Sequence, residues 1–183
     1  LVTPMQIASL YSSIANSGHV YRPYIVKQVT NHVGKVEFTQ EADELKASSI
    51  ISPANFKLMR TILASVVMDS EGTGFNAQVP GHSVAGKTGS VQVVSLKKNR
   101  NQTDVSMRWK EHAIFAAFSP VEGAEVAVAV VSQNDNVGGG GKAAAPVAQK
   151  ILAKYWSLKA RRKSEERRRI SVRKRRSSDV SLQ

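Results

Sequence analysis

Hydrophobic residues recur at helical spacing in three parts of the chain. The first part begins with Thr3-Pro4-Met5-Gln6, which combines an N-cap threonine, a proline at the first helical position and a glutamine that can close a capping box. Apolar positions then repeat as far as Ala15, and residues 16–18 (Asn-Ser-Gly) interrupt the pattern. The pattern therefore predicts a helix over residues 4–15 that buries one face.

Ser52-Pro53 repeats this start signal before a second helical pattern. Its apolar stripe consists of Phe56, Met59, Ile62, Leu63, Val66 and Val67. Full burial of five of these side chains would contribute on the order of 10 kcal/mol, so we expect this helix in the core. A glycine-rich loop over residues 133–141 precedes the third pattern, which predicts a helix over residues 143–156.

β-branched residues mark the strands. Residues 20–30, interrupted by Pro23, and residues 36–39 flank a five-residue segment, which predicts a hairpin at a sheet edge, and the polar residues 41–49 are interpreted as a connection. Two alanine- and valine-rich strands are expected over residues 113–118 and 125–132, joined by a turn, and covered on both faces. With the strand that precedes them they would form an antiparallel meander.

That preceding strand, predicted over residues 83–95, carries polar residues within an apolar pattern: Gly86, Lys87, Thr88, Gly89 and Ser90. Glycine weakens a strand interior and is usually tolerated where a bulge forms or another backbone approaches closely. An extended peptide that ends in a carboxylate would fit here, because the cation and the hydroxyls suit its charge. By itself, a K-T-G tripeptide remains weak evidence for such a site.

Composition and charge restrict the interpretation further. The 183 residues suit one domain or the end of a larger one, and the absence of cysteine excludes disulfides and thiolate zinc sites. Residues 157–183 carry eleven Lys or Arg against three acidic residues, whereas residues 1–156 carry fifteen against eleven. We therefore expect a folded part over 1–156 and a basic tail over 157–183. We expect the tail to continue the last helix for some turns, in which Glu165 or Glu166 can form an ion pair with Arg169. Beyond these turns we expect disorder.

Several other motifs carry little weight. The glycine run before Lys142 lacks the first glycine and the final hydroxyl of a phosphate loop, so it is interpreted as a flexible connection. The four histidines are scattered, and no metal or other cofactor is predicted. Ser95 and Lys98 match S-x-x-K, but the serine ends a strand, where residues three apart do not share a face. Ser132 and Asn134 match S-x-N but follow the lysine strand.

Taken together and in order, the motifs resemble the C-terminal part of a class B penicillin-binding protein transpeptidase domain, most closely the elongation-type penicillin-binding protein 2 group. The matching segments are TPMQIASLYSSIANSG, RPYIVKQV, MRTILASVV, EGTG, VAGKTGSVQV, EHAIFAAFSP, VAVAVVSQN and AAPVAQKIL. The resemblance implies an α+β fold shared with serine β-lactamases, in which an antiparallel sheet packs between helices, here incomplete at the N-terminus. It also implies a D,D-transpeptidase that cross-links peptidoglycan stem peptides through an acyl-serine and is trapped by β-lactams.

By this resemblance, Lys87 and Thr88 bind the substrate carboxylate, with Gly89 beside them, and the Ser90 N–H supplies half of an oxyanion hole. Lys87 and Ser90 are thus the expected catalytic residues. The family places its S-x-x-K and S-x-N before this strand, and neither precedes Lys87 here. We therefore expect the nucleophile outside this chain, which would begin partway through the domain at Leu1.

The resemblance further implies partners and a location. The partners are stem peptides, β-lactams, the upstream half of the domain and the glycosyltransferase of the elongation machinery that maintains cell shape. The location is the periplasmic face of the inner membrane, with an anchor in a preceding segment. An anionic membrane surface is a candidate partner for the tail.

Two other functions stay open on sequence grounds. One is a catalytically inactive, truncated relic that serves as a binding piece. The other is a nucleic-acid-binding or acidic-partner-binding module whose affinity comes from the tail, although the folded part shows no recognised nucleic-acid motif and no run of stacking aromatics.

Overall fold

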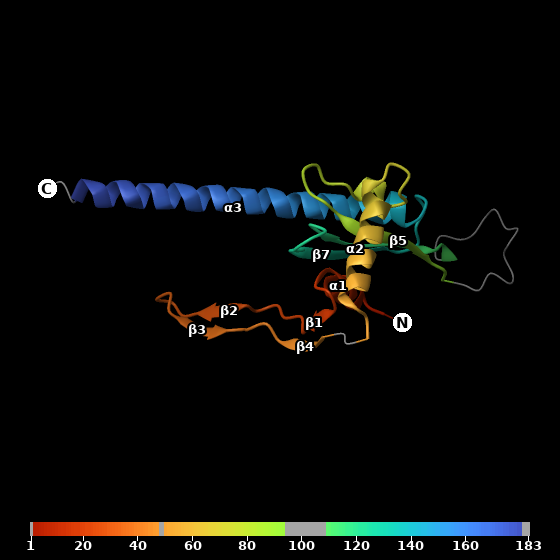
Figure 1. Cartoon of the computed structure of the whole chain (residues 1–183), viewed down its shortest axis with the longest axis horizontal. Helices are drawn as coiled ribbons and strands as arrows, with labels where there is room; N and C mark the ends of the chain where they lie inside the picture. The colour runs from red at the N-terminus through yellow and green to blue at the C-terminus, as the bar shows by residue number, and fades with distance from the viewer. Residues whose placement is uncertain (1, 48–49, 94–108, 181–183) are drawn as a thin grey trace, which may run out of the picture. The chain divides into compact units, whose positions relative to one another are not determined.

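The computed structural model describes residues 2–47, 50–93 and 109–180 (Figure 1). The chain forms two compact units, residues 1–149 and residues 150–183. Within the described residues, no helix is both long and apolar enough to cross a membrane. The predicted polar segment over residues 96–111 lies largely outside the described residues.

Both predicted N-terminal caps are present. Helix α1 (Pro4–Ala15) begins with a complete capping box, in which Gln6 N donates to Thr3 Oγ1 (3.2 Å) and Thr3 N donates to Gln6 Oε1 (2.8 Å). Helix α2 (Pro53–Met68) begins in the same way, with Asn55 N donating to the Ser52 hydroxyl over 3.3 Å. The side chains thus satisfy backbone donors that the first helical turn leaves unpaired.

Fewer side chains of α2 are buried in the structure than the sequence predicts. Among its stripe residues only Phe56 and Val67 are fully buried, while Ile62 is 54% exposed. At about 100° per residue, Ile62 lies about 120° around the helix from Phe56, so the six residues cover too wide an arc to face one core. The buried face instead includes Arg60, which is only 8% exposed.

A three-stranded antiparallel meander forms the centre of the first unit, as predicted. Its strands are β5 (Ala85–Val91), β6 (His112–Ser119) and β7 (Val126–Ser132), in the spatial order β5-β6-β7. Strand β6 is buried on both faces, but β7 is mostly half-buried, because it has a strand on one side only in the described chain. The expected double coverage therefore holds for β6 and not for β7.

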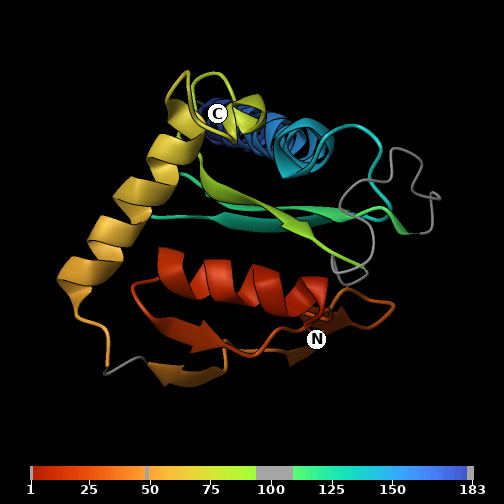
Figure 2. The same ribbon diagram turned by 90° about the vertical axis from the view of Figure 1, so that its right-hand side faces the viewer.

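Helical elements lie on both faces of this meander (Figure 2). On one face, Ile14 of α1 packs with Ala85 and Phe118, and side chains of α2 join this cluster. A π-helical turn, η4 (Gly140–Ala144), lies on the opposite face and leads into helix α3 (Ala145–Val180). The short 3-10 helix η1 (Phe75–Ala77) follows α2. This arrangement is the expected α+β architecture.

The segment between α1 and α2 differs from the prediction. Strand β2 (Gln28–Thr30) pairs with β3 (Val36–Thr39) as the predicted hairpin, but residues 20–30 are not one strand. Proline has no N–H to donate, and Pro23 lies in the break after the separate strand β1 (His19–Tyr21). The supposed connection contains β4 (Glu44–Ala47), which pairs with β1.

Helix α3 extends further than expected. It ends at Val180, so the described part of the basic tail is helical, and every side chain from Lys159 to Ser171 is exposed. An ion pair joins Arg161 Nε to Glu165 Oε1 over 3.5 Å, one turn apart. The boundary at residue 156 between a folded part and a tail stays a prediction.

Candidate functional site

The K-T-G residues lie on a strand that has one open edge within the described part of the chain. Within the described chain β5 pairs only with β6, in a register that places Lys87 opposite Ala116, Thr88 opposite Phe115 and Ser90 opposite Ala113. The other edge of β5 has no strand beside it among the described residues. An unpaired edge offers backbone donors and acceptors to an extended peptide.

The long Lys87 side chain brings its charge to Thr88. Strand alternation places the two residues on opposite faces of the sheet. Even so, Lys87 Nζ donates to the Thr88 carbonyl oxygen (3.1 Å) and lies 3.4 Å from Thr88 Oγ1. A cation on one face can therefore act beside a hydroxyl on the other face.

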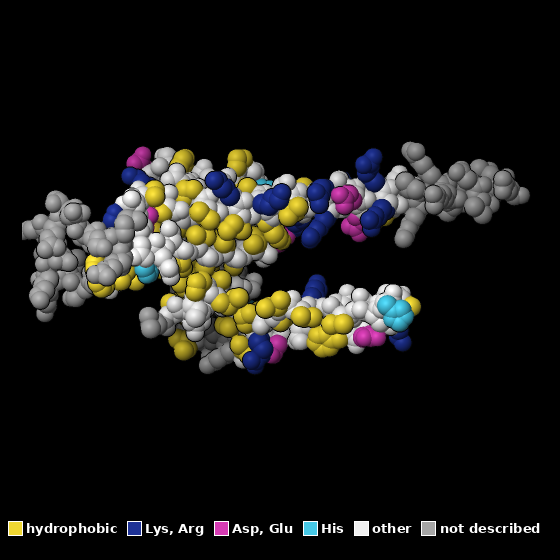
Figure 3. Space-filling model, turned by 180° about the vertical axis from the view of Figure 1, so that it is seen from behind, with side chains coloured by type: hydrophobic (Ala, Val, Ile, Leu, Met, Phe, Trp, Pro, Cys, Tyr) yellow, Lys and Arg dark blue, Asp and Glu magenta, His cyan; other side chains and the backbone are white. Residues whose placement is uncertain are grey.

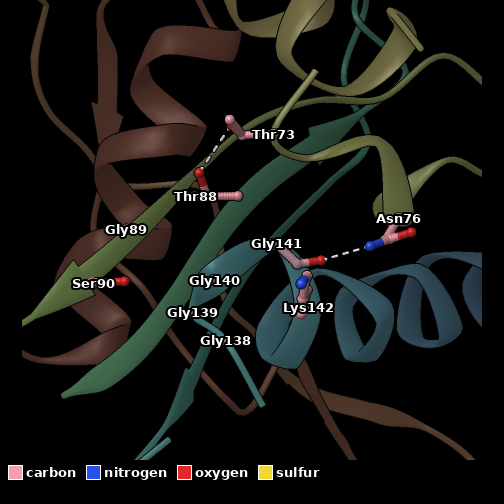
Figure 4. Close-up of a pocket in the computed structure, with 10 residues that line it drawn as sticks. All are labelled: Thr73, Asn76, Thr88, Gly89, Ser90, Gly138, Gly139, Gly140, Gly141 and Lys142. Atoms are coloured by element: carbon pink, nitrogen blue, oxygen red, sulfur yellow. Dashed lines mark hydrogen bonds between the residues drawn. The ribbon is translucent and has the colours of Figure 1, made fainter. Parts of the chain in front are cut away.

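Thr88, Gly89 and Ser90 line a pocket of about 480 Å³ between β5, the loop after α2, and the glycine-rich turn (Figure 4). Thr73 and Thr88 share a hydrogen bond between their hydroxyls (3.0 Å), and Asn76 Nδ2 donates to the Gly141 carbonyl (2.9 Å). The lining is thus rich in hydroxyl, amide and backbone groups, which suit a polar ligand.

Sequence reasoning missed several residues of this pocket. Thr73, Asn76 and the segment 138–142 line it, yet none had a predicted role. The EGTG segment that contains Thr73 was a usable signal, because it is one of the matching motifs and contains a hydroxyl between glycines. Nothing in the sequence indicates Asn76, because its place depends on contact with Gly141, far along the chain.

The glycine-rich segment is not the flexible connection that we expected. Asp135 accepts backbone hydrogen bonds from Val137 (3.0 Å), Gly138 (2.9 Å) and Gly139, and these bonds, led by that of Gly139, lower the pKa of its carboxyl. A Cβ on Gly140 would lie 2.2 Å from the Ile114 carbonyl oxygen. The turn therefore packs directly on β6, and only a glycine allows this approach.

The two glycines of the lysine strand differ in their surroundings. A Cβ on Gly86 would lie 2.7 Å from the Ala116 carbonyl oxygen and 2.9 Å from Phe115 Cζ, so packing within the protein requires this glycine. A Cβ on Gly89 would meet nothing closer than Ile114 Cβ at 3.8 Å. The chain's own contacts therefore leave space for a side chain at Gly89.

The serine motifs do not join this pocket in the described chain. The Ser95 match lies outside the described residues. Ser132 ends β7, and Asn134 N donates to His112 Nδ1 over 3.0 Å. A further S-x-x-K match, Ser171 to Lys174, lies on α3 in the second compact unit and follows the K-T-G strand in sequence. Within the described parts, no group of three or more His, Cys, Asp or Glu residues is placed to hold a metal.

An antiparallel meander between helices, with a K-T-G strand at its open edge, is the architecture that the resemblance implied. The chain belongs to the penicillin-binding protein transpeptidase domain family, because the sequence model of that family matches residues 1–153.

Relatives support this assignment. Peptidoglycan D,D-transpeptidase MrdA of Haemophilus influenzae is 32% identical over 158 residues, which cover 84% of this chain and 23% of that protein. Stage V sporulation protein D of Bacillus subtilis is 33% identical over 153 residues, with coverage of 82% and 22%. The chain thus spans less than a quarter of the length of these curated relatives.

Solved structures have the same fold. The D,D-transpeptidase domain of a peptidoglycan glycosyltransferase from Eggerthella lenta superimposes with a TM-score of 0.68 at 28% identity, covering 86% of this chain and 33% of that one. Penicillin-binding protein A from Mycobacterium tuberculosis, in its penicillin G acyl-enzyme complex, superimposes with a TM-score of 0.62 at 26% identity, with coverage of 84% and 31%.

Proposed function

We propose that this chain supplies the K-T-G wall of a serine D,D-transpeptidase that cross-links peptidoglycan stem peptides. The observation that carries the proposal is the edge of β5 that has no strand beside it among the described residues, together with the polar pocket that Thr88 and Ser90 line next to Lys87. The names of the relatives favour this activity over other functions of the same fold.

Each residue of the strand has a role in the proposal. Lys87 and the Thr88 hydroxyl bind the terminal carboxylate of the stem peptide, and Gly89 leaves space for the peptide backbone. The Thr88 carbonyl accepts a hydrogen bond from Lys87 Nζ, which suggests that it faces the open edge. Hydrogen-bonding direction alternates along an antiparallel strand, so the Ser90 N–H would face the same edge and act as an oxyanion donor.

The attacking serine comes, in this proposal, from residues outside the chain. No serine before Lys87 has a lysine three positions later, and a Ser/Lys pair at that spacing needs a helix to share a face. The upstream half of the domain would contribute the serine, form the acyl-enzyme and react with β-lactams in the same way. Its anchor would hold the enzyme at the periplasmic face of the inner membrane beside an elongation glycosyltransferase.

A labelled penicillin tests the proposal. The chain alone is expected to form no covalent adduct, whereas the longer protein, with the upstream segment restored, is expected to form one. In that protein Lys87→Ala should slow acylation by roughly 10- to 100-fold, because it removes a charged hydrogen-bond donor. Lys57→Ala, on the exposed face of α2, is the matched control and should leave the rate unchanged.

Two outcomes would contradict this function. A stoichiometric adduct on the chain alone, mapped to Ser95 or Ser171, would show that the nucleophile is present here. Failure of the longer protein to react would favour the alternative of an inactive relic that retains the binding wall.

A further inference from the structure

Helix α3 carries a dense series of exposed cations beyond residue 158. Every side chain from Lys159 to Ser171 is exposed, and Lys and Arg side chains follow the described part of the helix in Figure 3. Like charges one turn apart, such as Lys159, Lys163 and Arg167, destabilise a helix unless anions neutralise them. A partner that supplies anions would therefore stabilise this part of α3.

Cations lie on both halves of the helix, and the half centred on Arg167 differs from the other in the side chains that lie between its cations. At about 100° per residue, the half of the circumference centred on Arg167 also contains Trp156, Lys159, Lys163 and Ile170. Lys159 Nζ lies 5.1 Å from the centroid of the Trp156 ring, so these two side chains share that half of the helix. Ile170 is 49% exposed. Cations, one aromatic ring and one aliphatic side chain thus lie along one side.

The acidic residues lie on the other half of the helix. Glu165 and Glu166 both fall outside the half centred on Arg167. Glu165 forms its ion pair with Arg161, which also lies on the other half. Glu166 lies about 100° from Arg167 and three residues after Lys163, at the border of this half, so one acidic neighbour lies at the edge of the side that contains Lys159, Lys163 and Arg167 and none lies at its centre.

We propose that this side of α3 binds an anionic phospholipid surface, with the helix lying along the plane of the headgroups. Lys159, Lys163 and Arg167 contact lipid phosphates, while Trp156 and Ile170 lie at the boundary between headgroups and acyl chains. Aromatic and basic side chains on one face are typical of helices that lie at this interface. The binding is peripheral and mainly electrostatic, because only two of these five residues are large and apolar.

A nucleic acid fits these observations less well. Residues 157–182 contain no aromatic residue to stack on bases and no Asn or Gln to read adenine edges. Contacts with phosphates alone would also leave Trp156 and Ile170 without a role on the cationic side. The proposal does not depend on the transpeptidase site, because its residues all lie in the unit formed by residues 150–183.

Co-sedimentation of the full chain with lipid vesicles tests this proposal. The probes are vesicles of pure phosphatidylcholine, vesicles of an equal mixture of phosphatidylcholine and phosphatidylglycerol, and a DNA duplex without any preferred sequence. Two triple variants are compared, Lys159→Gln/Lys163→Gln/Arg167→Gln on the proposed face and Arg161→Gln/Arg162→Gln/Arg169→Gln on the other half. Both remove three positive charges from exposed helical positions, so their net charges match.

We expect binding to the mixed vesicles, little binding to pure phosphatidylcholine, and a decrease with added salt. The first triple variant should bind the mixed vesicles roughly a hundredfold more weakly, and the second less than tenfold. In a Trp109→Phe background, Trp156 is the only tryptophan, and its emission should shift to the blue on binding. Circular dichroism of each variant checks that the helix remains.

Three results would overturn the proposal. Equal losses in the two triple variants would show that net charge alone drives binding. Equal binding to both kinds of vesicle would exclude recognition of anionic lipid. Tighter binding to the DNA duplex than to the mixed vesicles at the same ionic strength would identify a nucleic acid as the better partner.

Discussion

Alanine at Gly86 and alanine at Gly89 should affect the protein in opposite ways, although both glycines lie in the same strand. At Gly86 the added Cβ would lie 2.7 Å from the Ala116 carbonyl oxygen and 2.8 Å from Ala117 Cβ. Ordinary carbon contacts lie at about 3.5–4.0 Å, and these neighbours belong to the central strand β6, which is packed on both faces. At Gly89 the closest atom would lie at an ordinary distance of 3.8 Å.

The difference in the free energy of unfolding between the two variants isolates the cost of the close contact at Gly86. Either substitution restricts the unfolded chain to a similar extent, which alone would stabilise the protein by about 0.4–1 kcal/mol. Overpacking at Gly86 costs about 1–3 kcal/mol, so the free energy of unfolding of Gly86→Ala should fall below that of Gly89→Ala by a similar amount. For a protein of this length, each kcal/mol moves the midpoint of thermal unfolding by about 2–4 °C.

Thermal unfolding followed by circular dichroism measures the two midpoints in the same buffer, with the unsubstituted chain as reference. Gly89→Ala should unfold at or above the reference midpoint, and Gly86→Ala below it. In the longer protein, Gly89→Ala should not lower the midpoint of thermal unfolding. It should slow the reaction with penicillin, because the methyl group takes the space proposed for a ligand. Equal midpoints, or a lower one for Gly89→Ala, would refute the packing argument.

The remaining predictions concern the hydrogen bonds of two polar side chains, Asp135 and Ser17. Because backbone hydrogen bonds lower the pKa of Asp135, its contribution to stability is present above the pKa of an unfolded aspartate and is lost as the pH falls through the lower folded value. Asp135→Asn should therefore weaken the loss of stability at low pH, measured as unfolding midpoints over a series of pH values. An unchanged pH profile would show that the backbone hydrogen bonds to Asp135 do not stabilise the fold. Arg60, which is only 8% exposed, donates from Nη1 to the Oγ of the exposed Ser17 over 3.0 Å, so Ser17→Ala should cost about 1 kcal/mol. That cost should vanish in an Arg60→Met background, and a double-mutant cycle by urea unfolding would show no coupling if the contact were unimportant.

Local sequence signals predicted the helix starts and the meander well. The caps of α1 and α2 involve residues three apart, so threonine or serine with its neighbours suffices to define them. The order of β5, β6 and β7 follows from alternating apolar runs joined in succession. Strand β4 escaped prediction, because its partner β1 lies more than twenty residues earlier and the side chains whose burial is described in this pair are mostly exposed, which leaves no hydrophobic pattern.

The sequence by itself determined where the helices begin, the succession of the central strands and the family to which the K-T-G strand belongs. Only the tertiary structure decided that Lys87 reaches Thr88 from the opposite face, that the glycine turn packs on β6, and that Thr73 and Asn76 line the same pocket as Ser90. The physical reason is the range of the interactions. Caps and periodic burial act within one or two helical turns, whereas the pocket depends on contacts between segments such as Asn76 and Gly141, which are 65 residues apart.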